Sequence, residues 1–368
     1  MRILVCNWKD LRHPRAGGAE VYTQEIARRW VAAGHSVTLF CAAVDGAPES
    51  EEIDGVQVVR RGGRFGVYRA AGEYYRRSGR GRFDLVIDEV NTRPFGCVQW
   101  VDDVPVVALI HQVCREIWRY EMPAPVAILG RYLLEPLWLR RYREVPTLTV
   151  SASSRDSLRR YGLRNVGIVP EGITRRPRPD VPRESDPTIV FLGRLARNKG
   201  PLEALAAFAL LRQRMPRARL WFVGDGPVRH LIASRAPASV TMHGRVSQAV
   251  RDELLARAHV LVVTSVREGW GLVVDEAASM GTPAVGYDRP GLRDSVPAAG
   301  GVLVPADPAA LADALERRLP GWTNSPAAQG WAGGAVDWDE VATAVLAQAT
   351  VGCGLRPHDE ELPCKPNR

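Results

Sequence analysis

Lysine is nearly absent from this chain: Lys9, Lys199 and Lys365 are the only three, although the net charge is +8 at pH 7. The positive charge is therefore almost entirely arginine, a bias that codon composition explains as readily as function. A basic net charge by itself indicates solubility and nonspecific attraction to anions, and it does not define a nucleic-acid site. We therefore do not expect nucleic acid as a partner.

The sequence also lacks the patterns of a structural metal site, a disulfide framework or a membrane span. Its six cysteines form no CxxC pair and do not cluster with histidines, which predicts free, buried thiols. No apolar run reaches the ~18 residues that a membrane-spanning helix needs. The N-terminal stretch MRILVCNWKD becomes polar too early for a secretory signal. These absences predict a cytoplasmic protein.

Short, apolar, β-branched runs are present throughout, and they alternate with longer segments of helical period. They lie at 3–6, 37–41, 56–59, 85–87, 106–110, 148–150 and 166–169, and again at 189–192, 220–223, 240–242, 260–263, 284–287 and 302–304. Helical segments such as 19–33 and 153–161 end at Gly34 and Gly162. Continuous apolar strands separated by helices predict parallel sheets covered on both faces.

The alternation is interrupted once, at residues 170–187, where PEGITRRPRPDVPRESDP carries five prolines and no periodicity. We therefore predict two doubly wound, Rossmann-like α/β domains with a ligand cleft between them, at the carboxyl ends of the strands. The expected boundaries are 1–172 for the first domain, 173–187 for a linker, 188–335 for the second domain, 336–350 for a last helix and 351–368 for a disordered tail.

The stretch REGWGLVVDE, residues 267–276, joins the predicted strand 260–263 to a helix that begins at Leu272. Gly269 and Gly271 allow the backbone to approach a ligand, and a helix start favours an anion. Glu268 and Glu276 would lie on the order of 10 Å apart, because a helix rises about 1.5 Å per residue. That spacing suits hydroxyl groups at the two ends of an extended ligand with a phosphate between them. The alternative is a pair of surface charges on an ordinary helix.

A second loop, FLGRLARNKG at 191–200, follows the first strand of the second domain. It places Arg194 and Lys199 after a turn at Gly193, and each of the two cations could neutralise a phosphate. Together they could stabilise a diphosphate as a divalent metal does elsewhere. Codon bias cannot account for Lys199, because lysine is so rare here.

Several of these motifs together resemble glycosyltransferase family 4, the retaining sugar-nucleotide enzymes of GT-B fold. In the second half the resemblance is carried by GRLARNKG, VGDGP at 223–227, HGRV at 243–246 and REGWGLVVDEAASMGTPAVG at 267–286. In the first half AGGAE at 16–20 resembles the family's glycine-rich loop, and ALIHQV places His111 at a strand end. VDWDEVA at 336–342 resembles the closing helix that crosses back onto the first domain. The resemblance spans essentially residues 1–345.

The resemblance implies a metal-independent transferase that moves a hexose from a nucleoside diphosphate sugar to a hydroxyl acceptor with retention of configuration. It assigns the sugar to Glu268 and His111, the ribose to Glu276, the diphosphate to Arg194 and Lys199, and further donor contacts to Gly17, Gly18, Gly193, Gly269, Trp270, Gly271 and Leu272. The donor base, the sugar and the acceptor, whether glycan, lipid or natural product, stay open. One departure is Glu171, where many members carry asparagine, and it receives no role. The alternative is a noncatalytic sugar-nucleotide-binding or partner protein on the same fold.

Three other features allow two interpretations each. Asp337-Trp338-Asp339 spells the D-x-D of metal-dependent transferases, but its position at a helix start favours a cap. Residues 60–82 carry eight arginines and one acid, which indicates either a solvated helix face or a patch for an acidic acceptor or an anionic membrane surface. Residues 122–142 mix large apolar side chains with arginines. They form either a core helix or a surface helix for a hydrophobic acceptor or a membrane.

Overall fold

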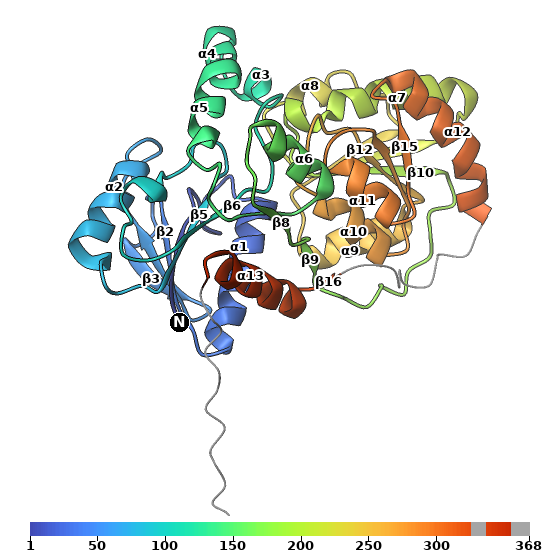
Figure 1. Cartoon of the computed structure of the whole chain (residues 1–368). Coiled ribbons are helices and arrows are strands. Elements are labelled where there is room, and N and C mark those ends of the chain that lie inside the picture. The colour runs from blue at the N-terminus through green and yellow to red at the C-terminus, as the bar shows by residue number, and fades with distance from the viewer. Residues whose placement is uncertain (325–335, 355–368) are drawn as a thin grey trace, which may run out of the picture.

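The computed structural model of the chain describes residues 1–324 and 336–354, which form two α/β lobes lying side by side (Figure 1). The first lobe is built on an eight-stranded sheet in the order β3-β4-β2-β1-β5-β6-β7-β8. Its strands are β1 (Arg2–Cys6), β2 (Ser36–Cys41), β3 (Ser50–Ile53), β4 (Val56–Arg60), β5 (Leu85–Glu89), β6 (Val106–Leu109), β7 (Thr147–Thr149) and β8 (Val166–Ile168). All neighbours are parallel except β3 and β4. The apolar runs at these positions are buried on both faces, as the sequence predicts.

Helices connect these strands and cover the sheet. They are α1 (Gly18–Ala32), α2 (Val67–Tyr74), the π-helix η1 (Tyr75–Gly79), the 3₁₀ turn η2 (Cys97–Gln99), α3 (Trp118–Glu121), α4 (Ala124–Leu129), the π-helix η3 (Gly130–Leu134), α5 (Glu135–Arg140) and α6 (Ala152–Arg160). The start of α1 is fixed by Glu20, whose carboxylate accepts a 2.6 Å hydrogen bond from the Gly17 N–H. That bond satisfies one of the amide donors that a helix start leaves unpaired.

The second lobe is built on a six-stranded, fully parallel sheet in the order β12-β11-β10-β13-β14-β15. Its strands are β10 (Thr188–Leu192), β11 (Arg219–Val223), β12 (Val240–Gly244), β13 (Val260–Val263), β14 (Ala284–Tyr287) and β15 (Val302–Val304). The helical elements are η4 (Arg197–Lys199), α7 (Pro201–Arg214), α8 (Arg229–Ala233), α9 (Gln248–Arg257), α10 (Leu272–Ser279), α11 (Leu292–Ala298) and α12 (Pro308–Asn324). The strand order places β10 and β13 next to each other, so the loops that follow them meet.

The chain returns to the first lobe through its last described helix. A short pair of strands, β9 (Gly172–Ile173) and β16 (Val336–Asp337), precedes α13 (Trp338–Gly352), which packs against α1. The Trp30 indole donates a 2.8 Å hydrogen bond to the Ala342 carbonyl, and Trp338 is buried in the core of the first lobe. A Cβ at position 172 would lie 2.5 Å from the Trp338 indole, so glycine permits this contact. The predicted GT-B architecture with a crossing helix is confirmed.

Four smaller features can be compared with the predictions from the sequence: the D-x-D motif, the cysteines, three short strands and the C-terminal tail. The Asp337 carboxylate accepts a 2.8 Å hydrogen bond from the Asp339 N–H and caps α13, in agreement with the interpretation as a cap. Among the described cysteines, Cys6, Cys41, Cys97 and Cys114 are buried free thiols, as predicted, whereas Cys353 is free but only half-buried. The strands β3, β9 and β16 were not predicted from the sequence, because they are short and carry no long apolar run. Most of the predicted disordered tail lies outside the described residues.

Acids compensate four of the eight arginines in residues 60–82, and the other four, Arg64, Arg76, Arg77 and Arg82, are exposed without an ion pair to the described residues. Arg60 is buried and bound to Asp10, and three more pair with acids: Arg61 with Glu49, Arg69 with Glu73 and Arg80 with Asp102. The tyrosines of the segment pack into or against the core.

The interpretation of residues 122–142 as a core helix is wrong for one face of the helix. Ile128 and Tyr132 are 61% and 66% exposed, because only the opposite face packs on the lobe.

Candidate active site

The two loops that carry the predicted diphosphate and sugar contacts are held together by backbone hydrogen bonds. The loop after β10 and the loop after β13 meet where Val266 N–H donates to the Asn198 carbonyl at 3.0 Å. The Thr264 hydroxyl donates to the Gly200 carbonyl at 2.7 Å. Gly200 has φ +69°, and a Cβ there would lie 2.3 Å from the Thr264 carbonyl oxygen. Glycine at position 200 therefore permits the close approach that fixes the two loops relative to each other.

This contact brings Lys199 and Glu268 together. The Lys199 ammonium lies 2.6 and 2.7 Å from the two carboxylate oxygens of Glu268, and the Ser265 hydroxyl donates to the same carboxylate at 2.6 Å. The Glu268 side chain is 13% exposed and that of Lys199 is 33% exposed. The carboxylate is therefore oriented by two donors and still open on one side.

Two helix starts lie close together at the boundary between the lobes. Gly271 precedes α10 with φ +104°, a conformation that favours glycine. Its neighbour Leu272 lies close to Gly18, the first residue of α1, because a Cβ at position 18 would lie 3.4 Å from Leu272 Cδ1. Each helix start carries partial positive charge and amide donors without helical partners. An anion placed between the lobes would be attracted by both.

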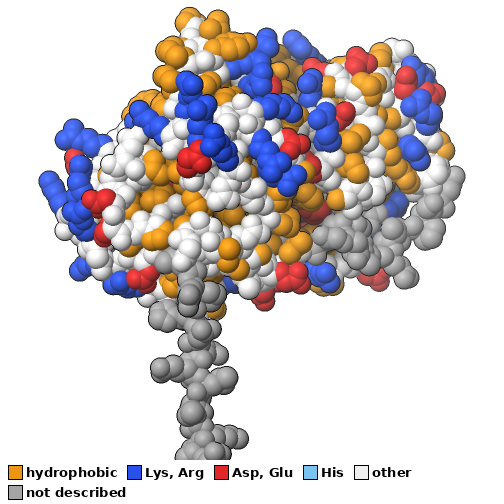
Figure 2. Space-filling model, viewed as in Figure 1, with side chains coloured by type: hydrophobic (Ala, Val, Ile, Leu, Met, Phe, Trp, Pro, Cys, Tyr) orange, Lys and Arg blue, Asp and Glu red, His pale blue; other side chains and the backbone are white. Residues whose placement is uncertain are grey.

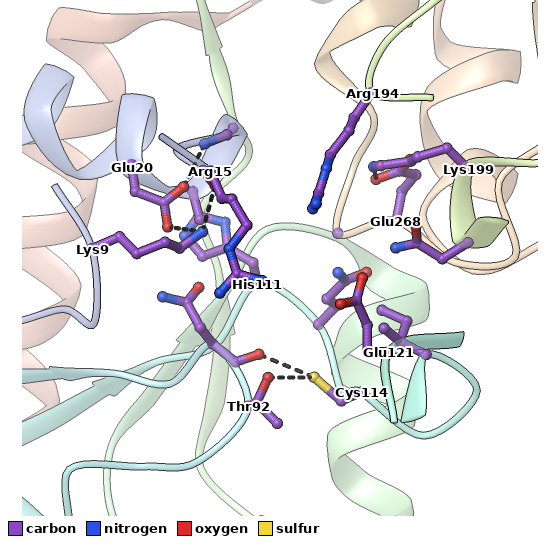
Figure 3. A pocket seen from close by; sticks show the side chains of 18 of the residues that line it. Lys9, Arg15, Glu20, Thr92, His111, Cys114, Glu121, Arg194, Lys199 and Glu268 are labelled. Carbon is purple, nitrogen blue, oxygen red and sulfur yellow. Dashed lines mark hydrogen bonds and ion pairs between the residues drawn. The ribbon is translucent and has the colours of Figure 1, made fainter. Parts of the chain in front are cut away.

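A cavity of about 410 Å³ opens at this place. Ten of the predicted site residues line it: Gly17, Gly18, His111, Arg194, Lys199, Glu268, Gly269, Trp270, Gly271 and Leu272. The Arg194 side chain reaches into the space beside Lys199 and Glu268 (Figure 3). It is exposed and forms no ion pair with any residue of the described chain. An uncompensated guanidinium that points into a cavity is suited to binding an anion.

His111 follows β6 and lies at the back of the cavity between two carboxylates. Its Nδ1 is 3.3 Å from Glu171 Oε1, and its Nε2 is 3.6 Å from Glu89 Oε1. Burial alone would lower the pKa of His111, but the two carboxylates outweigh it and raise the pKa to about 10. The ring is therefore an imidazolium at neutral pH, with its edge packed on Tyr22 at 4.8 Å between ring centroids. Glu171, the departure from the family pattern, thus faces a predicted site residue.

Replacing Glu171 by glutamine is expected to lower the pKa of His111 by about 1 to 2 pH units, because one of two opposite charges is removed. A raised histidine pKa stabilises the fold below the unfolded value near 6.5, and this stabilisation is lost as pH rises through about 10. The Glu171→Gln variant should lose this stabilisation at a lower pH than the wild type. An NMR titration of the His111 ring protons, with denaturant unfolding at pH 7 and 9, measures both effects. An unchanged titration midpoint would contradict this arrangement.

Two predicted donor-binding residues do not line the cavity. Gly193 lies in the turn behind Arg194, and its amide donates to the Val223 carbonyl at 3.0 Å. Glu276 lies inside α10 and pairs with Arg251 at 3.0 Å. Burial raises the pKa of Glu276, and its Oε2 is buried without a hydrogen-bond partner in the described chain. The free oxygen could accept a hydroxyl hydrogen bond, but the ligand would have to extend beyond the cavity to reach it.

Three cavity residues on the side of the first lobe were not predicted from the sequence. Lys9 lies 2.9 Å from the buried Glu20 carboxylate and 3.0 Å from the Arg15 carbonyl, and all three residues line the cavity. The Lys9 ammonium and the Arg15 guanidinium each lie 5.4 Å from the Trp8 ring centroid. The signal that singled out Lys199, the scarcity of lysine, applies equally to Lys9 and could have identified it.

The chain matches two family models, each over one lobe. Residues 16–176 match "Glycosyltransferase Family 4", and residues 186–320 match "Glycosyl transferases group 1". It is 28% identical to a glycogen synthase of Mycobacterium tuberculosis, over 94% of this chain and 93% of that protein.

Solved structures of the same architecture cover almost the whole chain. One is a sucrose-phosphate synthase from Thermosynechococcus elongatus, with a TM-score of 0.71 and 21% identity over 95% of this chain and 96% of that one. Another is Anabaena Alr3699/HepE in complex with UDP and glucose, with a TM-score of 0.65 and 16% identity over 95% of this chain and 100% of that one. The family models, the sheet order and the crossing helix agree, and the chain belongs to glycosyltransferase family 4, with the GT-B fold.

Proposed function

We propose that the protein transfers a hexose from a nucleoside diphosphate sugar to a hydroxyl acceptor with retention of configuration. The observation that carries this proposal is the charge arrangement of the cavity. Two cations, Arg194 and Lys199, and the starts of α1 and α10 surround one space, beside the carboxylate of Glu268. A diphosphate next to a polyhydroxylated sugar has the complementary pattern of charge and hydrogen-bond donors.

The hard step in such a transfer is the departure of a diphosphate. As the bond between the sugar C1 and the phosphate oxygen breaks, negative charge grows on the leaving group. Arg194, Lys199 and the start of α10 line the same cavity, and they would stabilise that charge on a diphosphate bound there. These groups supply the electrostatic role that a metal ion serves elsewhere, so we propose that transfer needs no metal.

The sugar would be held by Glu268 and His111. The Glu268 carboxylate, oriented by Lys199 and Ser265, can accept hydrogen bonds from sugar hydroxyls, and the His111 imidazolium can donate one. The acceptor oxygen then forms a bond to C1 on the face that the diphosphate leaves. Its proton passes to the departing phosphate oxygen, so no side chain is a covalent nucleophile. The protein contributes positioning and charge stabilisation.

A screen of nucleoside diphosphates tests the donor assignment. The diphosphates of uridine, guanosine, adenosine and thymidine are each added at 100 times the dissociation constant of the tightest binder. The one that fits should stabilise the fold by about 2.7 kcal/mol and raise the melting temperature by several degrees. Removal of divalent metal with a chelator should leave that shift unchanged. If none of the four raises the melting temperature, the donor assignment is wrong.

The alternative is a noncatalytic binder of sugar nucleotides on the same fold. Arg194 and Glu268 would contact the diphosphate and the sugar in either case, so turnover is the property that separates the two functions. Slow hydrolysis of the matching nucleotide sugar by the purified protein distinguishes the two, since a binder produces no free sugar.

A further inference from the structure

The first lobe carries a projecting helical arm whose outer face is apolar. The elements α4, η3 and α5 form one continuous helix over residues 124–140, and α4 projects beyond the rest of the lobe (Figure 1). Six large apolar side chains on this arm are exposed: Val126 (43%), Ile128 (61%), Leu129 (47%), Tyr132 (66%), Leu133 (49%) and Leu137 (45%). We call these six residues the apolar face of the arm. Most of them are separated by three or four residues, and together they occupy the outward half of the helix.

The inner side of the arm fixes this orientation. Gly130 packs so closely on Trp118 of α3 that a Cβ at position 130 would lie 2.4 Å from the indole. The buried Glu135 carboxylate accepts a 3.1 Å hydrogen bond from the same indole and a 2.5 Å bond from the Cys114 N–H. Rotation of the helix would break these bonds and expose Glu135. The apolar face is therefore held toward solvent by the packing beneath it.

The charges of the arm are of one sign. Within residues 122–143 the only acid is Glu135, which is buried. The exposed or half-buried charges are four arginines at positions 131, 140, 141 and 143. Figure 2 shows apolar side chains gathered at the tip of this projection and basic side chains below them. Exposed acids appear only at the ends of the segment, at Glu121, which lines the cavity, and at Glu144, which pairs with Arg164 at 3.1 Å.

We infer that the apolar face of the arm docks on an anionic lipid bilayer. A projecting face with apolar side chains above a row of arginines matches the layered chemistry of such a surface, apolar chains beneath anionic headgroups. A second copy of the chain would bring the arginines of one arm against those of the other. A small hydrophobic acceptor would need a concave site, and none of the six residues lines the cavity. Docking would be peripheral, because no helix within the described residues is long and apolar enough to cross a bilayer.

The arm also lies beside the candidate active site. The residues that precede it, Trp118, Glu121 and Met122, line the cavity between the lobes. A docked arm would hold the cavity mouth near the lipid headgroups. If the proposed transfer is correct, this placement favours an acceptor hydroxyl carried by a lipid. Docking itself does not rest on the proposed function, and it is measured without donor or acceptor.

The test is cosedimentation of the full chain with vesicles of phosphatidylcholine containing one third phosphatidylglycerol. The wild type should bind these vesicles and bind pure phosphatidylcholine at least tenfold more weakly. The double variant Ile128→Asp/Tyr132→Asp should lose at least tenfold in partitioning, because it places two acids on the apolar face. The matched control Val250→Asp/Val351→Asp changes two exposed apolar residues on α9 and α13 and should bind like the wild type.

A milder variant keeps the test valid if the double variant does not fold. Arg140→Gln removes one exposed charge and should weaken binding about fivefold at low salt, with the difference vanishing at high salt. Circular dichroism and the melting temperature check the fold of each variant. Equal binding of wild type and Ile128→Asp/Tyr132→Asp, or no binding of wild type to anionic vesicles, overturns the inference. A concentration-dependent dimer that the double variant abolishes would assign the apolar face to a second copy and would overturn it as well.

Discussion

Replacing Glu268 by glutamine is expected to lower kcat/KM for sugar transfer by about a thousandfold while the protein stays folded. Positive charge develops on the sugar ring as the bond to the diphosphate breaks, and a carboxylate at this position stabilises it more than a neutral amide does. Glutamine has the same shape, so the change tests charge and not volume. The carboxylate also orients the Lys199 ammonium at 2.6 Å, and the amide nitrogen of glutamine cannot accept that hydrogen bond.

The measurement is initial rates with the donor that the diphosphate screen identifies, together with the melting temperature of each variant. Glu253→Gln provides a matched control. Glu253 lies on α9, pairs with Arg257 at 3.0 Å and is 43% exposed, so its loss should change neither rate nor fold. A Glu268→Gln enzyme with wild-type rates would show that this carboxylate has no part in the chemistry, and the proposed function would lose its main support on the sugar side.

The strands of both lobes were predictable because parallel, fully buried strands must be apolar along their whole length. The runs at 3–6 and 260–263 coincide closely with β1 and β13. The edge strand β3 was not predictable, since its sequence SEEI is polar and its pairing with β4 is made by the backbone. For the arm, residues 124–140, the sequence pattern predicts a buried helix, whereas one face of the helix is exposed. Its apolar residues satisfy the pattern of a core helix, and only tertiary packing on Trp118 and Glu135 determines which face is buried.

The second-lobe part of the site was predictable for a different reason. Positive φ angles and close contacts require glycine at positions 200 and 271, and glycines at such positions can be recognised in a sequence. The environment of His111 cannot be recognised in this way. Its partners Glu89 and Glu171 are 22 residues before and 60 residues after it, and only the assembled sheet brings them within 3.6 Å. The same holds for the contact of Gly18 with Leu272, which depends on how the two lobes meet.

Replacing Arg194 by alanine is expected to lower kcat by about a thousandfold, because the variant removes the unpaired cation that reaches into the cavity beside Lys199. Lys199 can compensate only in part, since its ammonium is shared with both oxygens of Glu268. Arg194→Lys should recover part of the rate, as lysine restores the charge but not two parallel hydrogen bonds to a phosphate.

The control for this change lies in the same loop. Arg197 is also exposed, but it does not line the cavity, so Arg197→Ala should keep wild-type rates. Calorimetry with the nucleoside diphosphate separates binding from catalysis. If Arg194 stabilises mainly charge that grows during departure, the Arg194→Ala variant should bind the diphosphate product far more weakly while KM for the intact donor changes little. Equal losses in KM and in product affinity, with kcat unchanged, would instead make Arg194 a ground-state contact and leave the leaving group without its proposed stabilisation.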